Sequence, residues 1–292
     1  MWRNGFLLIL AVTGSFALKA QYGNSISVAN NPSFDKVKFS LSATNGQCVI
    51  EPGQLLNVLD IHSSADEADE PKYEERIVDR TKEVSIALGS NSSGDLSETI
   101  SRRMFGAGPN EDKTWKVYLS NLKPLDLDLH YTIGDTYINL SDLHVEKLKM
   151  RSGSANVKVN YDKGRGNLAQ MDTFLIKVDM GSLEANNLYL CNSSHIITDV
   201  GFGKVKMDFK DAEVIRTNVS ASVGAGRLEV ILPVQSIPVR ININDSPLCQ
   251  IKMPKEFQKV SENVFVTPGF DETIEDGLDF SVDVAIGNIV FK

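Results

Sequence analysis

The chain has 292 residues and a formal net charge of −8; 42% of its residues are hydrophobic and 23% are charged. This composition is that of a folded protein and excludes disorder over most of the chain. The acidic balance, without a basic stripe among aromatic residues, excludes nucleic acid as a partner because negative charges repel a phosphate backbone.

The first predicted element is an export signal at residues 1–20. A basic residue precedes the apolar run 6–12, and small residues follow up to Ala20, which is the layout of a secretory signal peptide. The run is shorter than the roughly 20 residues of a membrane-spanning helix. We expect cleavage after Ala20, or alternatively after Ala17. The mature chain would then be periplasmic, on the cell surface or secreted, and without a transmembrane segment.

Alternation of apolar and polar residues predicts β-strands through most of the remaining chain. Residues 36–50, KVKFSLSATNGQCVI, alternate on both sides of an Asn45-Gly46 turn, which is a strand and turn pattern. The pattern returns in TIGDTYINL, LKMRSGSANVKV, FLIKVDMGSLEANNLYL, IITDVGFGKVKMDF, SVGAGRLEVIL and SVDVAIGNIVF.

Two segments depart from this pattern. Residues 63–80 are densely charged and contain a proline, which predicts an exposed excursion. In residues 93–105, Leu96, Ile100 and Met104 follow one another at four-residue spacing. This spacing predicts one short helix, with a strand-containing loop as the alternative.

Turn glycines recur at a nearly regular interval. They are Gly46, Gly134, Gly153, Gly181, Gly203, Gly226 and Gly287. From Gly134 to Gly226 the successive intervals are 19, 28, 22 and 23 residues, and repeats of this size are typical of solenoids. Glycine suits such turns because positive φ costs it little. We therefore predict an all-β fold, a single-stranded, β-helix-like β-solenoid with repeats of about 19–28 residues. An antiparallel β-sandwich is the alternative.

The repeat pattern also predicts the domain organisation. We expect a single solenoid domain over residues 21–292, with the clearest repeats at 123–232. Four prolines fall between residues 233 and 254, so we expect 233–292 to form an irregular end. Stacked coils would bury the alternating apolar residues in a common interior, which a single repeat could not do.

The best candidate for metal binding is LDLDLH, residues 125–130. On a strand, Asp126, Asp128 and His130 would lie on one face, and carboxylate and imidazole groups bind divalent ions. A solvated strand gives the same alternation, so both interpretations stay open. Two GxG sequences lack the third glycine and the helix of a nucleotide site. No catalytic residue and no cofactor is therefore assigned.

Two further groups of residues bear on chemistry. Cys48, Cys191 and Cys249 permit one disulfide at most; the sequence does not choose a pair, and three unpaired buried thiols are the expectation. Some β-helical enzymes cleave acidic polysaccharides with calcium and a basic residue. The candidates for such a role are Lys204, Lys206, Arg227 and Arg240.

The segment PLDLDLHYTIGDTYINLSDLHVEKLKMRSGSANVKV, followed by VGFGKVKMDF, VGAGRLEVILP and IGNIVF, resembles the bacterial putative-adhesin family of toast-rack β-solenoid domains. The resemblance implies a secreted or envelope-associated protein without known catalytic residues. It favours a non-enzymatic interaction scaffold whose partner would be an envelope protein or a glycan. A metal-dependent, lyase-like polysaccharide enzyme is the alternative, and the oligomeric state stays open.

Overall fold

The computed structural model describes residues 25–54, 56–63, 71–88, 114–213, 216–234, 237–245, 247–271 and 277–292. Nearly all of its regular structure is β-strand. The strands are β1 (Ser25–Ala29), β2 (Lys36–Ala43), β3 (Gln47–Pro52), β4 (Asn57–Ser63), β5 (Lys72–Val78), β6 (Thr81–Leu88), β7 (Thr114–Leu119), β8 (Leu125–Asn139), β9 (Val145–Asn160), β10 (Thr173–Asn186), β11 (His195–Asp208), β12 (Arg216–Ile231), β13 (Val239–Asp245), β14 (Cys249–Lys252), β15 (Gln258–Lys259), β16 (Val264–Val266) and β17 (Gly277–Phe291).

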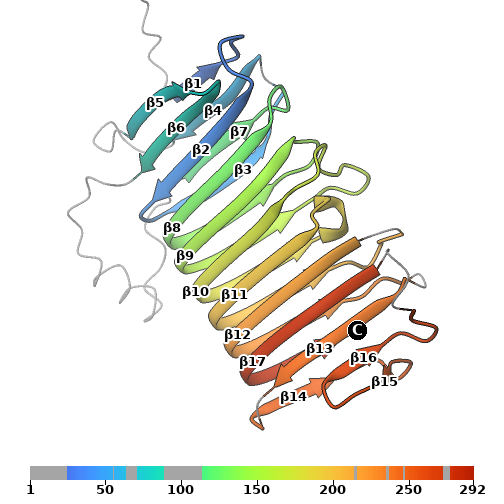
Figure 1. Ribbon diagram of the computed structural model, residues 1–292. Helices are drawn as coiled ribbons and strands as arrows, with labels where there is room; N and C mark the ends of the chain where they lie inside the picture. The colour runs from blue at the N-terminus through green and yellow to red at the C-terminus, as the bar shows by residue number, and fades with distance from the viewer. Residues whose placement is uncertain are drawn as a thin grey trace, which may run out of the picture.

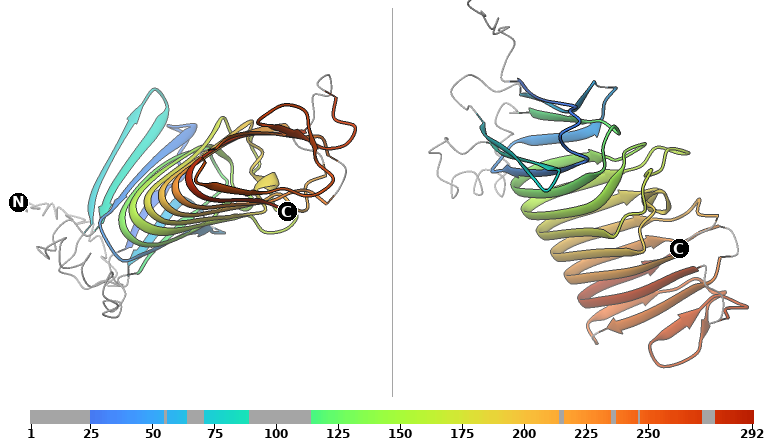
Figure 2. Two further views of the ribbon diagram at one scale, coloured as in Figure 1. Left: turned by 90° about the horizontal axis from the view of Figure 1, so that it is seen from below. Right: turned by 45° about the horizontal axis from the view of Figure 1, so that its top comes forward.

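The fold is an all-β solenoid. Each long strand from β8 to β12 forms one coil that bends near its middle, so its two halves belong to two facing sheets (Figures 1 and 2). We call the sheet of first halves, with β2, β6 and β13, the front sheet, and the sheet of second halves, with β3, β7 and β14, the rear sheet. The two sheets meet at a bend edge, and loops form the opposite, loop edge.

Successive coils pair in parallel and in register, from β8 through β9, β10 and β11 to β12. Inward positions therefore stack in columns. One column consists of Phe39, Val84, Leu127, Leu148, Phe174, Ile196, Val219, Phe280 and Ile241, all of which are buried. Each such side chain contributes about 1.5–3 kcal/mol through burial. The parallel pairing of the coils excludes the antiparallel sandwich.

The coils bend at one column of small residues. In register order the column is Gly46, Gly134, Ala155, Gly181, Gly203, Gly226 and Gly287. Its six glycines have positive φ. At Gly203, an added Cβ would lie 1.6 Å from the carbonyl oxygen of Gly181, so glycine is required there for space as well as for backbone conformation.

One predicted turn glycine is not in this column. Gly153 precedes it by two residues, and Ala155 takes the bend position. The φ angle of Ala155 is not positive, so this coil bends with a backbone conformation that accepts a Cβ. The Ser-Gly-Ser sequence resembles a turn, but the register is fixed by the buried side chains on either side, Met150 and Val157.

The N-terminal strands build the first coils and close that end of the stack. β2 and β3 lie on the two halves of β8, and β6 and β7 lie outside them. β4 and β1 continue the rear sheet in antiparallel pairing.

Part of the predicted charged excursion belongs to this end of the sheet. β5 pairs antiparallel with β6 through Asp79 and Arg80, both at positive φ, as in a tight two-residue hairpin. Residues 72–78 are largely exposed, as predicted, but they form a strand paired with β6 rather than an irregular excursion. The predicted helix at 93–105 lies outside the described residues, as do the export signal and residues 64–70.

The C-terminal part combines one long bent strand with several short ones. β17 lies between β12 on one side and β13 and β14 on the other, in parallel with all three. After β12 the chain first forms the terminal coil, which contains β13 and β14. It then returns as β17, which occupies the position between β12 and that coil. β16 and β15 extend the front sheet beyond β13 in antiparallel pairing. β17 has the same alternating, bent pattern as the earlier coils, whereas the terminal coil is divided into the short strands β13 and β14 and extended by the antiparallel strands β16 and β15.

None of the three cysteines forms a disulfide. Cys48 and Cys191 are buried, whereas Cys249 is partly exposed, which differs from the expectation of three buried thiols. No helix in the described part of the chain has the length and apolar content that a bilayer crossing requires.

Candidate functional site

Outward side chains of the front sheet form columns that run along the solenoid axis, because parallel strands in register place equivalent positions side by side. One column consists of Ser40, Asp128, Lys149, Leu175, Ile197, Ser220, Ser281 and Asn242. The chemistry of the outer surface therefore changes from coil to coil while the interior stays apolar.

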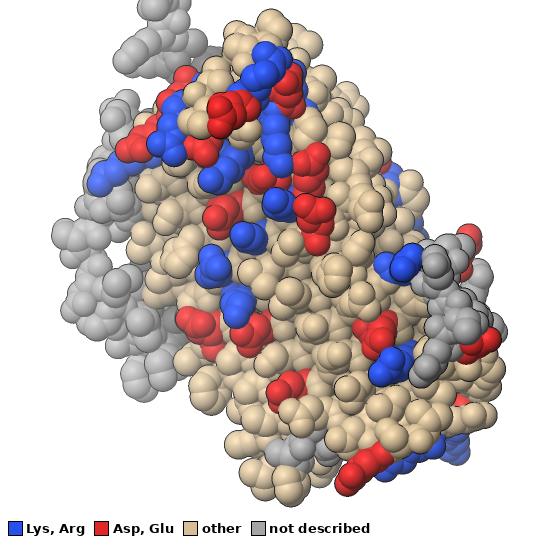
Figure 3. Space-filling model, in the orientation of Figure 1, with Lys and Arg blue, Asp and Glu red and all other residues tan. Residues whose placement is uncertain are grey.

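Charged side chains gather on the N-terminal coils of this face (Figure 3). Lys36 Nζ lies 2.7 Å from Glu146 Oε2 and 2.9 Å from Asp126 Oδ2. Lys38 Nζ lies 3.4 Å from Glu83 Oε1. Burial alone would lower the pKa of Lys36, but its hydrogen bonds to Glu146 and Asp126 outweigh burial and raise that pKa. Lys36 and Lys38 are thus engaged in ion pairs within the protein.

The C-terminal half of the front sheet carries few charges (Figure 3). It has a groove of about 360 Å³. Its floor includes Ser220 and Ser222 on β12 and Ser281 on β17, and Ser220 lies beside Ser281 in register. Lys177, Ile197 and Asp199 line it toward the N-terminal coils, and Asn242 and Asn244 line it toward the terminal coil. The groove exists because serine side chains are shorter than their neighbours on a nearly flat sheet.

Charged and amide groups flank the serine floor. On one side, Lys177 Nζ lies 3.1 Å from Asp199 Oδ2. On the other, Asn244 Nδ2 donates to Asp283 Oδ2 over 3.3 Å, and Asn242 is exposed next to it on β13. Hydroxyl, amide and carboxylate groups together donate and accept hydrogen bonds. The groove is therefore suited to a polar, hydrogen-bonding ligand.

A larger hollow of about 910 Å³ lies at the loop edge near the C-terminal coils, with Val234, Ile237, Phe257 and Phe270 among its lining residues. Two of these flank residues 235–236, which lie outside the described residues. We take the groove on the front sheet as the candidate site because it lies on the regular strands of the solenoid.

The predicted metal residues lie elsewhere. Asp126, Asp128 and His130 all point outward from the first half of β8, and Asp126 is engaged with Lys36. Among the described residues, no group of three or more His, Cys, Asp or Glu side chains is arranged to hold a metal ion. The structure therefore does not bring these three residues together as ligands.

The basic residues considered for a polysaccharide-cleaving site are also separated. Lys204, Lys206 and Arg227 lie on the rear sheet, where Lys206 Nζ is 2.9 Å from Glu184 Oε1 and Arg227 Nη2 is 2.9 Å from Glu229 Oε2. Arg240 lies on the front sheet. The sequence-based set thus does not form one cluster.

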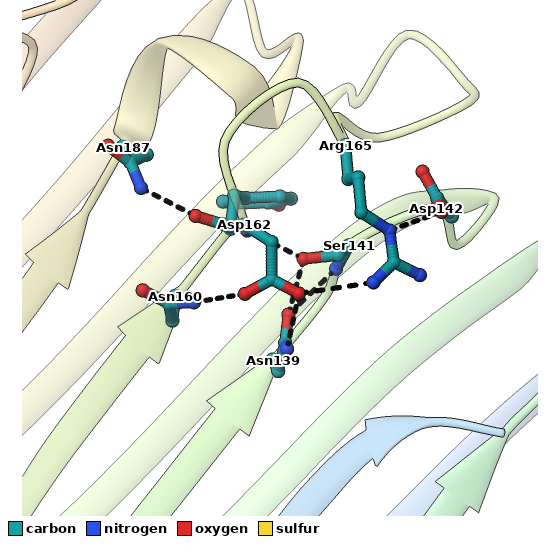
Figure 4. Close-up of polar contacts among 8 residues, drawn as sticks. Asn139, Ser141, Asp142, Asn160, Asp162, Arg165 and Asn187 are labelled. Atoms are coloured by element: carbon teal, nitrogen blue, oxygen red, sulfur yellow. Dashed lines mark hydrogen bonds and ion pairs between the residues drawn. The ribbon is translucent and has the colours of Figure 1, made fainter.

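The loop edge contains a polar network around Asp162 (Figure 4). Its carboxylate accepts hydrogen bonds from Asn139 over 3.3 Å, Asn160 over 3.0 Å and Arg165 over 3.3 Å, and its backbone N–H donates to Ser141 Oγ over 2.7 Å. These bonds join the ends of β8 and β9 to the loop after β9. We assign the network to the structure of the loop edge because its donors and acceptors satisfy one another.

Sequence reasoning did not identify the groove. A signal was present in three polar pairs at i and i+2, namely Ser220 with Ser222, Asn242 with Asn244, and Ser281 with Asp283. Each pair is typical of the solvent-facing side of an ordinary strand. Their combination depends on the insertion of β17 between β12 and β13, which the local pattern does not encode.

A match to a known protein family shows which family the chain belongs to. The family described as the N-terminal domain of toast_rack, DUF2154, matches residues 23–181, more than half of the chain. The chain belongs to this toast-rack family. No curated protein matches it.

Two solved structures are similar to this toast-rack protein over most of its length. One is a putative cell adhesion protein from Clostridium sporogenes ATCC 15579, with 17% identity, a TM-score of 0.43, and coverage of 92% of this chain and 97% of that one. The other is a putative adhesin from Bacteroides fragilis NCTC 9343, with 10% identity, a TM-score of 0.38, and coverage of 92% and 95%.

The groove lies almost entirely beyond the part of the chain that the toast-rack family match covers. The match ends at residue 181, and among the groove residues only Lys177 precedes that point. The toast-rack match therefore accounts for the coils of the scaffold but says nothing about the groove.

Proposed function

We propose that this toast-rack protein is a non-enzymatic, adhesin-like scaffold of the bacterial cell envelope that binds a glycan or a protein through its front sheet. The observation that carries the proposal is the polar groove on an otherwise regular solenoid, in which outward residues vary while the interior repeats. A continuous apolar interior makes such a surface rigid, and a rigid surface loses little conformational entropy on binding.

Export and domain organisation belong to the same proposal. Residues 1–20 would direct the chain out of the cytoplasm, and residues 21–292 would form one solenoid domain. The column of buried residues from Phe39 to Phe280 supports a single domain because it runs without a break through the coils. Mass spectrometry of the protein from isolated envelopes is expected to find its N-terminus at Gln21; a protein that retains residues 1–20 in the cytoplasm would contradict export.

Binding is tested with purified residues 21–292 on a panel of immobilised extracellular proteins and polysaccharides. We expect saturable binding to at least one of these two classes of ligand. A variant in which the front sheet is blocked should lose this binding, and a variant in which the rear sheet is blocked should keep it. Shortened or unsaturated polysaccharide products would contradict the non-enzymatic part of the proposal. The absence of binding across both classes would contradict the scaffold itself.

A further inference from the structure

We infer that the groove on the front sheet is a carbohydrate subsite for an uncharged glycan chain that lies along the solenoid axis. This inference rests on the proposed function and specifies its ligand class. It is carried by the position, the polarity and the direction of the groove.

The position of the groove disfavours a peptide. Its floor lies on β12 and β17, and both strands are paired on both sides, β12 with β11 and β17, and β17 with β12 and β13. Backbone N–H and C=O groups there are already bonded within the sheet. An extended peptide binds a sheet by adding a strand at a free edge, and the groove has no such edge.

The polarity of the groove fits a ligand rich in hydroxyl groups. Ser220, Ser222 and Ser281 each offer a hydroxyl that both donates and accepts, and Asn242 offers both functions through its amide. A sugar hydroxyl also donates and accepts, so each contact can be satisfied in either direction. Ile197, which is 36% exposed, adds an apolar surface for the C–H face of a sugar ring.

The charges of the groove favour an uncharged glycan. Among the described residues that line it, Lys177 is the one cation and is engaged with Asp199, and Asp283 adds a second carboxylate. The groove therefore carries a net negative charge, which repels uronate or sulfate groups. The same negative charge distinguishes the groove from the site of an enzyme that acts on acidic polysaccharides.

The direction of the groove fits a chain rather than one sugar. Its residues come from five neighbouring strands, in the spatial order β10, β11, β12, β17 and β13. At about 4.8 Å between strands, the groove extends for roughly 19 Å along the axis. Several consecutive rings could thus contact equivalent positions on successive strands.

The test uses residues 21–292 and calorimetric titration with cellohexaose, chitohexaose and mannohexaose as neutral probes and hexagalacturonate as the acidic probe. Ser222→Tyr and Ser281→Tyr fill the groove. Asn218→Tyr is the matched control, because Asn218 is exposed on the same face of β12 but does not line the groove. Thermal unfolding of each variant verifies that it is folded.

We expect at least one neutral probe to bind and hexagalacturonate to bind more weakly. Either groove-filling variant should reduce the affinity at least tenfold, and Asn242→Ala should reduce it about tenfold through the loss of its hydrogen bonds. Asn218→Tyr should bind like the unaltered protein.

Equal affinity in Ser222→Tyr and Asn218→Tyr would overturn the assignment of the groove while the proposed scaffold function stands. A preference for hexagalacturonate would overturn the inference of an uncharged ligand. If none of the probes binds, the carbohydrate subsite is overturned, and binding to a protein of the wider panel would then decide whether the scaffold function survives.

Discussion

Single residues decide where each coil bends and how closely the coils stack. At the bend edge, Gly203 and Gly226 bring their backbone so near the preceding coil that an added Cβ would lie within 2 Å of a carbonyl oxygen. The side chain just before the bend is free to be large, as Phe202 shows by being 63% exposed. Glycine at the bend thus has a steric role that its neighbours do not share.

Replacing Gly203 with alanine should destabilise the protein strongly. The Cβ would meet the carbonyl oxygen of Gly181 at 1.6 Å, and φ is +146°. We expect a loss of at least about 3 kcal/mol in the free energy of unfolding, measured by urea denaturation. Gly164→Ala is the control, since φ is also positive but the space is open; it should cost about 1 kcal/mol. Similar losses for both variants would contradict the role of close stacking.

The cysteines should differ in reactivity according to their burial. Burial raises the pKa of Cys48 and of Cys191 to about 12, so neither forms a thiolate at neutral pH. Cys249 is partly exposed, although its Sγ donates to the carbonyl oxygen of Val284 over 2.8 Å.

At pH 8 a disulfide reagent such as Ellman's reagent should modify Cys249 in the native protein and all three thiols only in denaturant. Cys249→Ser should abolish the native reaction. Rapid labelling of Cys48 or Cys191 in the folded protein would show that the core opens or is packed differently.

At the scale of elements, the coils are joined by parallel ladders within each sheet and by polar networks at the loop edge. Asp162 is the centre of one network, with three side-chain donors on its carboxylate. Such networks fix the loop geometry that lets the chain leave one coil and enter the next in register. The bend edge relies on glycine and close stacking instead.

Replacing Asp162 with alanine should cost about 2 kcal/mol, because the side-chain donors of Asn139 and Asn160 lose their acceptor while they stay partly buried. Asp172→Ala is the control. Its carboxylate is 72% exposed and lies 3.9 Å from Lys147, so its loss should cost at most about 0.5 kcal/mol. Urea denaturation measures both, and an equal effect would show that the network at Asp162 adds no more than a surface ion pair.

For the molecule as a whole, the insertion of β17 is the decisive topological step. It joins β12 to the terminal coil and buries Phe280, whose ring packs edge-on against Phe209 and Phe291 at centroid distances of 5.7 Å. Without β17, β12 would present an unpaired edge, which invites association with other chains. The same insertion completes the groove, because Ser281 and Asp283 belong to β17.

Phe280→Ala should therefore destabilise the protein by about 3–5 kcal/mol, as expected for a fully buried aromatic side chain. Phe202→Ala is the control, because Phe202 is largely exposed, and it should change the stability by less than about 1 kcal/mol. Light scattering should in addition detect association of the Phe280→Ala protein under mildly denaturing conditions. Equal stability of the two variants would contradict a central role for β17.

The sequence by itself determined the all-β solenoid, because alternation and recurrent glycines are local properties that each coil repeats. It placed Gly134, Gly181, Gly203 and Gly226 near their turns but misplaced the bend at Gly153, since a Ser-Gly-Ser turn signal does not encode the register fixed by buried neighbours. The family resemblance was confirmed by the match to residues 23–181.

Only the tertiary structure decided where β17 lies and which outward residues meet. Ser222 and Asn244 are on strands that touch the same groove solely because β17 pairs with both of their strands. The physical reason is that strand order depends on the total burial and pairing of distant segments, whereas each strand's own pattern fixes only which of its side chains face inward. The scaffold can therefore be predicted from the local sequence, whereas the candidate site depends on the order of the strands in the sheet.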